Sequence, residues 1–464
     1  MLKIFSHHIS SQSLVNLLID AAVLALGLLI GFSLQIEGSP AVAVDWRMAV
    51  PSALVFALAM MVLNSAFGLY KPFADPSLRT VVGRLALPVL VSMPVAYGIY
   101  SVLPWGHFAP EAGGLTSVLL LAFVMLNRGI ANRGQRSALM ARRVLVLGTG
   151  EDAALVERVL TGPEARSLSV VGFIPTAQDG ERCVSPSRIV EYSGRLVEFV
   201  RREQVDEVIV AVRERRGGVL PMRELLDCKL LGVKVLDLSS FYERVQGQVR
   251  IESLKASWLI YGEGFRQGFA RTVVKRIFDL IASLVLLILA FPVMIIAAIA
   301  ILIEDGAPIF YSQERVGQGG RSFRVIKFRS MRRDAEKDGK PKWAQSNDDR
   351  VTRVGRFMRR TRIDELPQLF NVLKGEMSMV GPRPERPYFV DQLTADIPFY
   401  AVRHCVKPGL TGWAQVRYQY GASVDDALQK LQYDLYYVKN HTLFLDSLVL
   451  CETVHVVLTG QGAH

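Results

Sequence analysis

Two adjacent carboxylates, Asp364 and Glu365, lie in the run Thr-Arg-Ile-Asp-Glu-Leu-Pro-Gln-Leu-Phe at 361–370. The stretch 313–362 before them carries 16 Lys and Arg against 6 Asp and Glu. A carboxylate among many cations suits chemistry on phosphates. It can attack phosphorus or bind Mg²⁺ while the cations neutralise the departing phosphate. Such a pair is also common on solvated helix faces, so the rest of the chain must decide between the two interpretations.

The composition places the chain among membrane-associated proteins. It has 464 residues, of which half are hydrophobic, and a net charge of +11. This length and composition predict two or three domains with membrane segments. The basic stretch suits phosphorylated substrates or an anionic membrane surface, and without a nucleic-acid-binding module we expect no nucleic-acid partner. The four cysteines form no CxxC or Cys/His cluster, so neither a zinc site nor a disulfide framework is predicted.

Four apolar stretches in the first third are candidates for membrane-spanning helices. They run over about 14–34, 49–69, 85–103 and 115–126. Basic residues follow the second and fourth stretches, whereas residues 101–117, after the third, contain no Lys or Arg. By the positive-inside rule, this pattern predicts a four-helix transmembrane region over 1–136, with the N-terminus and the residues after 130 in the cytoplasm.

A fifth apolar segment, at about 280–303, has basic residues on both sides and Pro292 near its middle. If it crossed the bilayer, it would carry the ten surplus positive charges of the basic stretch out of the cytoplasm. Proline removes a helix hydrogen bond and favours a kink. A helix that enters the bilayer and returns on the same side agrees with both features. A simple spanning helix with a tolerated proline is the alternative.

Between the apolar regions, strand-like and helix-like patterns alternate. Strand-like runs at 143–147, 168–174, 207–212 and 232–238 predict a parallel, Rossmann-like α/β domain over 142–245. Gly148, Gly150 and Ala153 match a loose dinucleotide fingerprint. Asp179 is only a weak candidate for the acidic residue that such sites use on the ribose. Nucleotide binding by this domain is therefore left open.

The last 190 residues carry five motifs in order. These are Lys275-Arg-Ile-Phe-Asp279, Lys327-Phe-Arg-Ser-Met331, the run from Ile363-Asp-Glu-Leu-Pro-Gln to Gly381-Pro-Arg-Pro384, Lys407-Pro-Gly-Leu-Thr-Gly-Trp-Ala-Gln-Val416 and Tyr433-Asp-Leu-Tyr-Tyr-Val-Lys-Asn440. Together they resemble the bacterial sugar transferases, the monotopic polyprenyl-phosphate phosphoglycosyl transferases. The first half of the chain is similar to the long form of this family. Residues 225–265 are similar to the exopolysaccharide-associated subgroup of exosortase-containing bacteria.

The resemblance implies a reaction. A sugar-1-phosphate would move from a UDP-sugar to undecaprenyl phosphate, which gives a polyprenyl diphosphosugar and UMP and initiates exopolysaccharide or capsule synthesis. Asp364 would form a covalent phosphosugar intermediate, Glu365 would assist it, and Mg²⁺ would bridge Asp364 and the diphosphate. The candidates for substrate binding are Lys327, Arg329, Arg359, Arg383, Arg386, Gly412 and Gln415.

The resemblance also implies an architecture. We expect a membrane protein with a four-helix transmembrane bundle, a Rossmann-like α/β domain, a linker over 246–272, and a mostly α-helical phosphoglycosyl transferase domain over 273–464. A re-entrant helix at about 277–303, broken at Pro292, would hold this domain on the cytoplasmic face of the bacterial inner membrane, in contact with lipid. The long form implies a homodimer. Phe291 and Arg362 depart from the family pattern, which has Ser and a small polar residue at these places.

Two other functions deserve comparison. A membrane-anchored NAD-dependent nucleotide-sugar dehydratase or epimerase needs a Tyr-x-x-x-Lys pair, which the chain lacks. A non-catalytic scaffold of polysaccharide assembly would be free to lose the carboxylate pair or the Gly-Pro-Arg-Pro loop, and both are present. The sugar itself is left open among glucose, galactose and an N-acetylated amino sugar.

Overall fold

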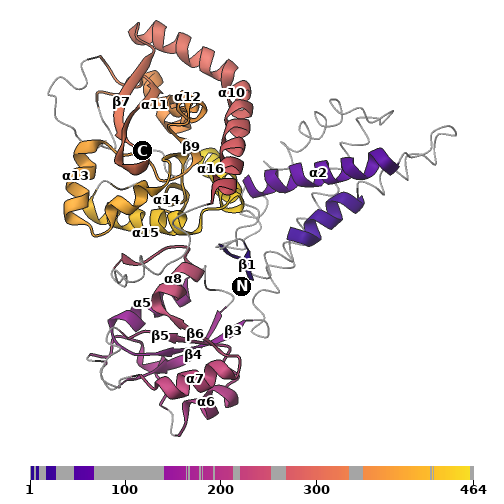
Figure 1. Cartoon of the computed structure of the whole chain (residues 1–464), viewed down its shortest axis with the longest axis vertical. Coiled ribbons are helices and arrows are strands. Elements are labelled where there is room, and N and C mark those ends of the chain that lie inside the picture. Colours follow the sequence, from indigo (N-terminus) through magenta and orange to yellow (C-terminus); the bar gives the residue numbers. More distant parts are fainter. Residues whose placement is uncertain are drawn as a thin grey trace. The chain divides into compact units, whose positions relative to one another are not determined.

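The computed structural model of the chain (Figure 1) describes residues 2–4, 7–9, 17–27, 46–66, 141–251, 268–333 and 349–459, apart from short gaps within 163–219 and 419–422. Apart from a few residues at the start of the chain, it divides into two compact units, one ending at Gln246 and one beginning at Gly247. Strands β1 (Leu2–Ile4) and β2 (His7–Ile9) pair with each other near the start of the chain.

The first unit contains a parallel sheet with strand order β4-β3-β5-β6. Its strands are β3 (Arg142–Leu147), β4 (Leu168–Ile174), β5 (Glu207–Val210) and β6 (Lys234–Asp237). Its helices are α5 (Glu151–Thr161), η3 (Pro186–Arg188), α6 (Leu196–Arg202), α7 (Met222–Leu230) and α8 (Leu238–Val245). Alternate residues of β3 enter two separate apolar clusters, as the two-residue period of a strand requires. The predicted parallel α/β architecture is therefore confirmed.

The glycine turn of this unit is bonded to the chain's own Asp179. Gly148 follows β3 with φ +119°, and a Cβ there would lie 2.5 Å from the carbonyl oxygen of Ala211, so only glycine fits. Thr149 donates to Asp179 Oδ2 from its backbone N (2.7 Å) and its Oγ1 (2.9 Å). A dinucleotide fingerprint would place a pyrophosphate at such a turn. Here a carboxylate bonds the turn instead.

The long apolar helix α10 (Phe269–Asp305) has 37 residues. Among the described residues it is the one helix long and apolar enough to cross a membrane. The helix continues across Pro292, and Figure 1 shows it strongly bent rather than interrupted. A bend is the ordinary effect of a proline inside a helix.

The predicted N-terminal spans are described only in part. A helix covers Leu17–Gly27, within the first predicted span, and α2 (Trp46–Ala66) overlaps most of the second. The third and fourth predicted spans, at 85–103 and 115–126, lie outside the described residues.

Besides α10, the second unit consists of short strands and many helices. Strands β7 (Phe310–Val316) and β8 (Ser322–Phe328) form an antiparallel hairpin, and β9 (Ser378–Val380) pairs in parallel with β10 (Gly409–Thr411). The helices are η5 (Gln318–Gly320), α11 (Arg353–Thr361), η6 (Ile363–Glu365), α12 (Gln368–Lys374), α13 (Pro387–Asp396), η7 (Tyr400–Cys405), α14 (Trp413–Arg417), α15 (Val424–Asn440) and α16 (Leu443–Thr459).

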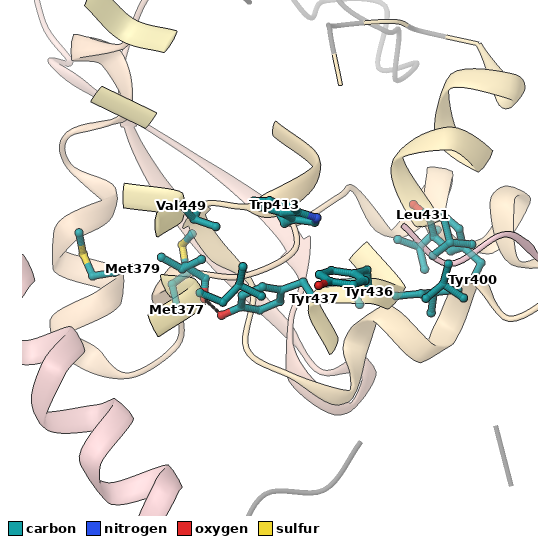
Figure 2. Close-up of a cluster of buried hydrophobic side chains, with 14 of the residues drawn as sticks. Met377, Met379, Tyr400, Trp413, Leu431, Tyr436, Tyr437 and Val449 are labelled. Carbon is teal, nitrogen blue, oxygen red and sulfur yellow. Dashed lines mark hydrogen bonds between the residues drawn. The ribbon is translucent and has the colours of Figure 1, made fainter. Parts of the chain in front are cut away.

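The core of the second unit surrounds Trp413, Tyr436 and Tyr437 (Figure 2), with Met377 and Met379 packed beside them. Residues 247–251, which lie inside the predicted linker, belong to this core. Trp413 Nε1 donates to the carbonyl of Gly247 at 2.7 Å. The backbone N of Val249 donates to Gln432 O at 3.0 Å, and the side chains of Val249 and Ile251 are buried in the same cluster. The packed fold therefore starts at Gly247.

Candidate active site

Asp364 and Glu365 lie on the single turn η6, between α11 and α12. Arg362 ends α11 and begins η6 with φ 59° and ψ 16°, a left-handed conformation that stops a helix and turns the chain. On either side of the pair, Ile363 and Leu366 pack against the cluster formed by the second half of α10. The chain thus turns just before the carboxylates, and apolar neighbours pack the turn against α10.

Three cations converge on one oxygen of Glu365. Its Oε1 lies 2.7 Å from Arg383 Nη2, 3.0 Å from Lys327 Nζ and 3.6 Å from Arg362 Nη1. Burial alone would raise the pKa of this carboxyl, but Arg383, Lys327 and Arg362 hold its pKa well below the usual range. Glu365 is therefore an anion fixed by its neighbours and a poor candidate for attack on a substrate.

Asp364 has the opposite environment. The side chain is buried, and among the described residues its Oδ1 has no hydrogen-bond partner. Burial and the adjacent charge of Glu365 raise the pKa of Asp364 to about 6, against the lowering effect of Lys327, Arg359 and Arg362. A carboxyl with this pKa is mostly ionised at neutral pH, yet more basic than an ordinary aspartate. Asp364 is thus the member of the pair with a carboxylate oxygen that makes no hydrogen bond to the described residues.

Lys327 reaches the pair from β8, on the hairpin that follows α10. Burial lowers the pKa of its ammonium group, and the charge of Glu365 opposes that effect. Arg359, on α11, donates from Nε to Ser330 Oγ at 3.0 Å and acts electrostatically on Asp364. The structure therefore brings three of the candidate residues, Lys327, Arg359 and Arg383, together around the carboxylates.

Two other predicted arginines lie elsewhere. Arg329 is buried, and its Nη2 donates to the carbonyls of Gly306 (2.5 Å) and Asp305 (3.2 Å), which holds the end of α10. Arg386 forms the N-cap residue of α13 and acts electrostatically on Arg315. Neither has a contact with the carboxylate pair among the described residues.

Gly412 and Gln415 lie beside the Gly-Pro-Arg-Pro loop. A Cβ on Gly412 would collide with the carbonyl oxygen of Gly381, so the glycine allows β10 and the loop to approach each other closely. Gln415, on α14, has a buried Oε1 that lacks a hydrogen-bond partner in the described part of the chain. Gln415 thus places a buried polar atom next to Gly412, whereas Gly412 acts through the backbone.

The residues fit a magnesium ion that is shared with a substrate. Across the described residues, no group of three or more His, Cys, Asp and Glu gathers as a protein-only metal site. Mg²⁺ is usually held by one or two carboxylates together with substrate phosphates. Asp364, with its unpartnered Oδ1, would be the carboxylate to hold such an ion, because Glu365 is engaged by cations.

Sequence reasoning missed Arg403 and Asp434, a buried ion pair behind the Gly-Pro-Arg-Pro loop. One signal was available. Asp434 stands in the motif Tyr433–Asn440, on a helix whose neighbouring residues Leu431 and Leu435 are apolar. A carboxylate on such a buried face requires a cationic partner.

Comparison with known proteins identifies relatives of this chain. A family model described as bacterial sugar transferase matches residues 270–460. A UDP-N-acetylgalactosamine-undecaprenyl-phosphate N-acetylgalactosaminephosphotransferase of Aeromonas hydrophila is 44% identical over 241 residues, which cover 52% of this chain and 56% of the relative. A UDP-glucose:undecaprenyl-phosphate glucose-1-phosphate transferase of Xanthomonas campestris pv. campestris is 29% identical over 100% of this chain and 97% of its own. An undecaprenyl-phosphate galactose phosphotransferase of Salmonella typhimurium is 31% identical, over 75% of this chain and 74% of its own.

Proposed function

This chain belongs to the bacterial sugar transferase family and is a phosphoglycosyl transferase, and on that premise we propose that it moves a sugar-1-phosphate from a UDP-sugar to undecaprenyl phosphate through a phosphosugar intermediate on Asp364. One observation carries the choice of nucleophile. Of two adjacent buried carboxylates, Glu365 is bound by three cations, whereas Asp364 Oδ1 has no partner among the described residues.

The first half-reaction is a displacement at phosphorus. An oxygen of Asp364 attacks the phosphorus that carries the sugar, a new carboxyl–phosphorus bond forms, and UMP leaves with the electron pair of the broken bond. In the second half-reaction, an oxygen of undecaprenyl phosphate attacks the same phosphorus and Asp364 departs as a carboxylate. The products are undecaprenyl-diphosphosugar and UMP.

The cations lower the barrier by neutralising phosphate charge. Lys327 and Arg383 both contact Glu365, so the glutamate holds both side chains in place for the phosphates of the substrate. Arg359 lies where its charge acts on Asp364. Asp364 would also hold Mg²⁺, which when bound would supply further neutralisation of the diphosphate.

The membrane segment acts as a re-entrant helix. Near its start, Arg276 donates to the carbonyls of Val372 (2.6 Å) and Leu373 (2.7 Å), and at its end Arg329 donates to Gly306 O. Both ends of α10 are therefore held by the same unit, which supports a helix that enters the bilayer and returns. If α10 were straight, its 37 residues would form a helix about 55 Å long.

The surface of α10 agrees with contact with lipid. Ile288, Leu289, Phe291 and Ile296 all expose more than half of their side chains. In this proposal Phe291, which replaces the serine of the family pattern, faces acyl chains. We also propose that the chain has four N-terminal membrane spans and that its catalytic unit lies on the cytoplasmic face of the inner membrane. It would form a homodimer and start exopolysaccharide synthesis.

The test is UMP release by the purified full-length protein with undecaprenyl phosphate and Mg²⁺. The donors are UDP-glucose, UDP-galactose and UDP-N-acetylgalactosamine, and Asp364→Asn is assayed in parallel. Release with one donor that the substitution abolishes would support the reaction and name the sugar. Unchanged release by Asp364→Asn would exclude the covalent mechanism, and no release with any of these donors would point to a rarer donor, a required partner or a scaffold.

A further inference from the structure

The loop Gly381-Pro-Arg-Pro384 has no regular secondary structure, so its position depends on its main-chain contacts. All four residues are held. Gly381 N donates to Thr411 O at 2.9 Å, and Pro382 O accepts from Gly409 N at 3.0 Å. Arg383 O accepts from Arg403 Nη2 at 2.9 Å, and Pro384 O accepts from Arg315 Nη1 at 3.3 Å. The placement of Arg383 is thus set from behind the loop.

Arg403 makes the contact at Arg383 itself, and it is buried. Its Nη2 also lies 2.8 Å from Asp434 Oδ2, and its Nη1 donates to the hydroxyl of Tyr400 at 2.7 Å. The side chains of Arg403 and Asp434 are only 6% and 2% exposed. A buried guanidinium has few alternative partners, so its geometry is fixed by the carboxylate that neutralises it.

Helix α15 supports the loop at a second point. Tyr437 lies three residues after Asp434 and therefore on the same face of the helix. Its hydroxyl lies 2.9 Å from Val380 O and 2.6 Å from Asp446 Oδ1, so its one proton is shared between these two acceptors. Residues of one helix thus fix the strand that enters the loop directly and the arginine inside the loop through Arg403.

We infer that Asp434 and Arg403 are positioning residues, which hold the main chain of Arg383 so that its guanidinium stays on Glu365 beside the nucleophile. The inference rests on the proposed function. The connection runs from Asp434 to Arg403, from Arg403 to the carbonyl of Arg383, and from Arg383 Nη2 to Glu365 Oε1 at 2.7 Å. Substitution of Asp434 or Arg403 should therefore affect the substrate site even though neither residue needs to touch the substrate.

The test is a double-mutant cycle in the full-length enzyme. Asp434→Asn keeps the shape of the side chain and removes its charge. We expect it to lower kcat/KM for the UDP-sugar about tenfold or more, and to weaken binding of UDP in an equilibrium measurement. Arg383→Lys is the second variant. If Asp434 acts through Arg383, the double variant should be no more than about twofold worse than Arg383→Lys alone.

The matched control is the buried pair Arg244–Glu207 of the α/β unit, 2.6 Å apart and with side chains 6% and 2% exposed. Glu207→Gln should lower Tm while it leaves kcat/KM and UDP affinity unchanged. Effects of Asp434→Asn and Arg383→Lys that multiply would overturn the inference. The inference would also be overturned if Asp434→Asn lowered Tm but left kcat/KM and UDP affinity unchanged.

A second variant and a binding measurement cover the cases in which Asp434→Asn does not fold or the enzyme shows no turnover. If Asp434→Asn does not fold, Arg403→Lys replaces it, because a lysine keeps the charge but cannot reach Asp434, Tyr400 and the carbonyl of Arg383 together. UDP affinity can be measured without turnover. The cycle thus tests positioning even if no UDP-sugar gives UMP, whereas loss of release in Asp364→Asn concerns the proposed reaction alone.

Discussion

The guanidinium of Arg383 and the carboxylate of Glu365 are joined at 2.7 Å across 18 positions of the chain. A cation suited to hold phosphate is therefore anchored by the residue next to the nucleophile. The same glutamate oxygen receives Lys327. Glu365 thus holds the cations of the site in place, and in the proposed reaction Asp364 is the nucleophile.

Glu365→Gln should lower kcat for UMP release by about a hundredfold, because it leaves Lys327, Arg362 and Arg383 without their shared anion. Unlike Asp364→Asn, it should still form a detectable phosphosugar intermediate. Glu314→Gln, at an exposed glutamate of β7, is the control and should not change the rate. Near-normal kcat in Glu365→Gln would contradict the organising role.

The rate should depend on pH through Asp364. Its pKa is raised to about 6, so the fraction of ionised nucleophile falls as the pH drops through that value. The pH dependence of kcat/KM reports ionisations of the free enzyme. We expect kcat/KM to be constant above about pH 7 and to decrease below pH 6, with a limiting slope of about tenfold per pH unit. Arg359→Gln removes a charge that lowers this pKa and should move the fall to higher pH. A profile that is flat down to pH 5 would contradict the assignment.

Removal of Mg²⁺ should stop turnover with little effect on the stability of the free protein, because the carboxylate pair offers one unpartnered oxygen, Asp364 Oδ1, and the described residues gather no metal cage. Thermal unfolding measures this directly. Mg²⁺ alone should leave Tm nearly unchanged, whereas Mg²⁺ with UDP should raise it by binding linkage. A large rise with Mg²⁺ alone would indicate a resident metal site.

The two ends of α10 should face the same side of the membrane. Thr272 and Ser312 are exposed positions just inside its start and just beyond its end. After replacement of the native cysteines, Thr272→Cys and Ser312→Cys should both react with an impermeant maleimide in inverted vesicles and neither in spheroplasts. Labelling of one position from each side would show a spanning helix.

Gly412→Ala should destabilise the catalytic unit, because its Cβ would collide with the backbone of Gly381. Overpacking of this kind costs about 1–3 kcal/mol and should appear as a lower Tm together with weaker UDP binding. Gly268→Ala, where a Cβ has nothing within 4 Å, is the matched control with a small expected effect. Equal Tm values for the two variants would argue against the close approach of β10 and the loop.

Local patterns were sufficient for the parallel sheet, because strand-like and helix-like runs alternate along 142–245. Lys327 and Arg383, which lie near the carboxylates, stand in the motifs that carry the family resemblance. The distinction between Asp364 and Glu365 was not visible in the same way. It arises because side chains 18 and 38 positions away reach one carboxylate and not the other.

Other positions were beyond local reasoning for similar reasons. Arg329 and Arg359 look alike in a basic stretch, yet one holds the end of α10 and the other lies near the nucleophile. A proline within an apolar run does not tell a bend from an interruption, and α10 continues across Pro292. Asp179 bonds a turn 30 residues earlier in the chain, a pairing that spacing alone does not reveal.

The packing of Gly247 beneath Trp413 sets where the catalytic unit can be cut. The match to the family model starts at residue 270, but the hydrogen bond to Trp413 Nε1 and the buried side chains of Val249 and Ile251 lie upstream of it. An expression fragment trimmed to the motifs would leave an indole N–H unsatisfied and an apolar hole beside the aromatic cluster. A fragment intended for crystallisation or assay should therefore keep the chain from Gly247 onward.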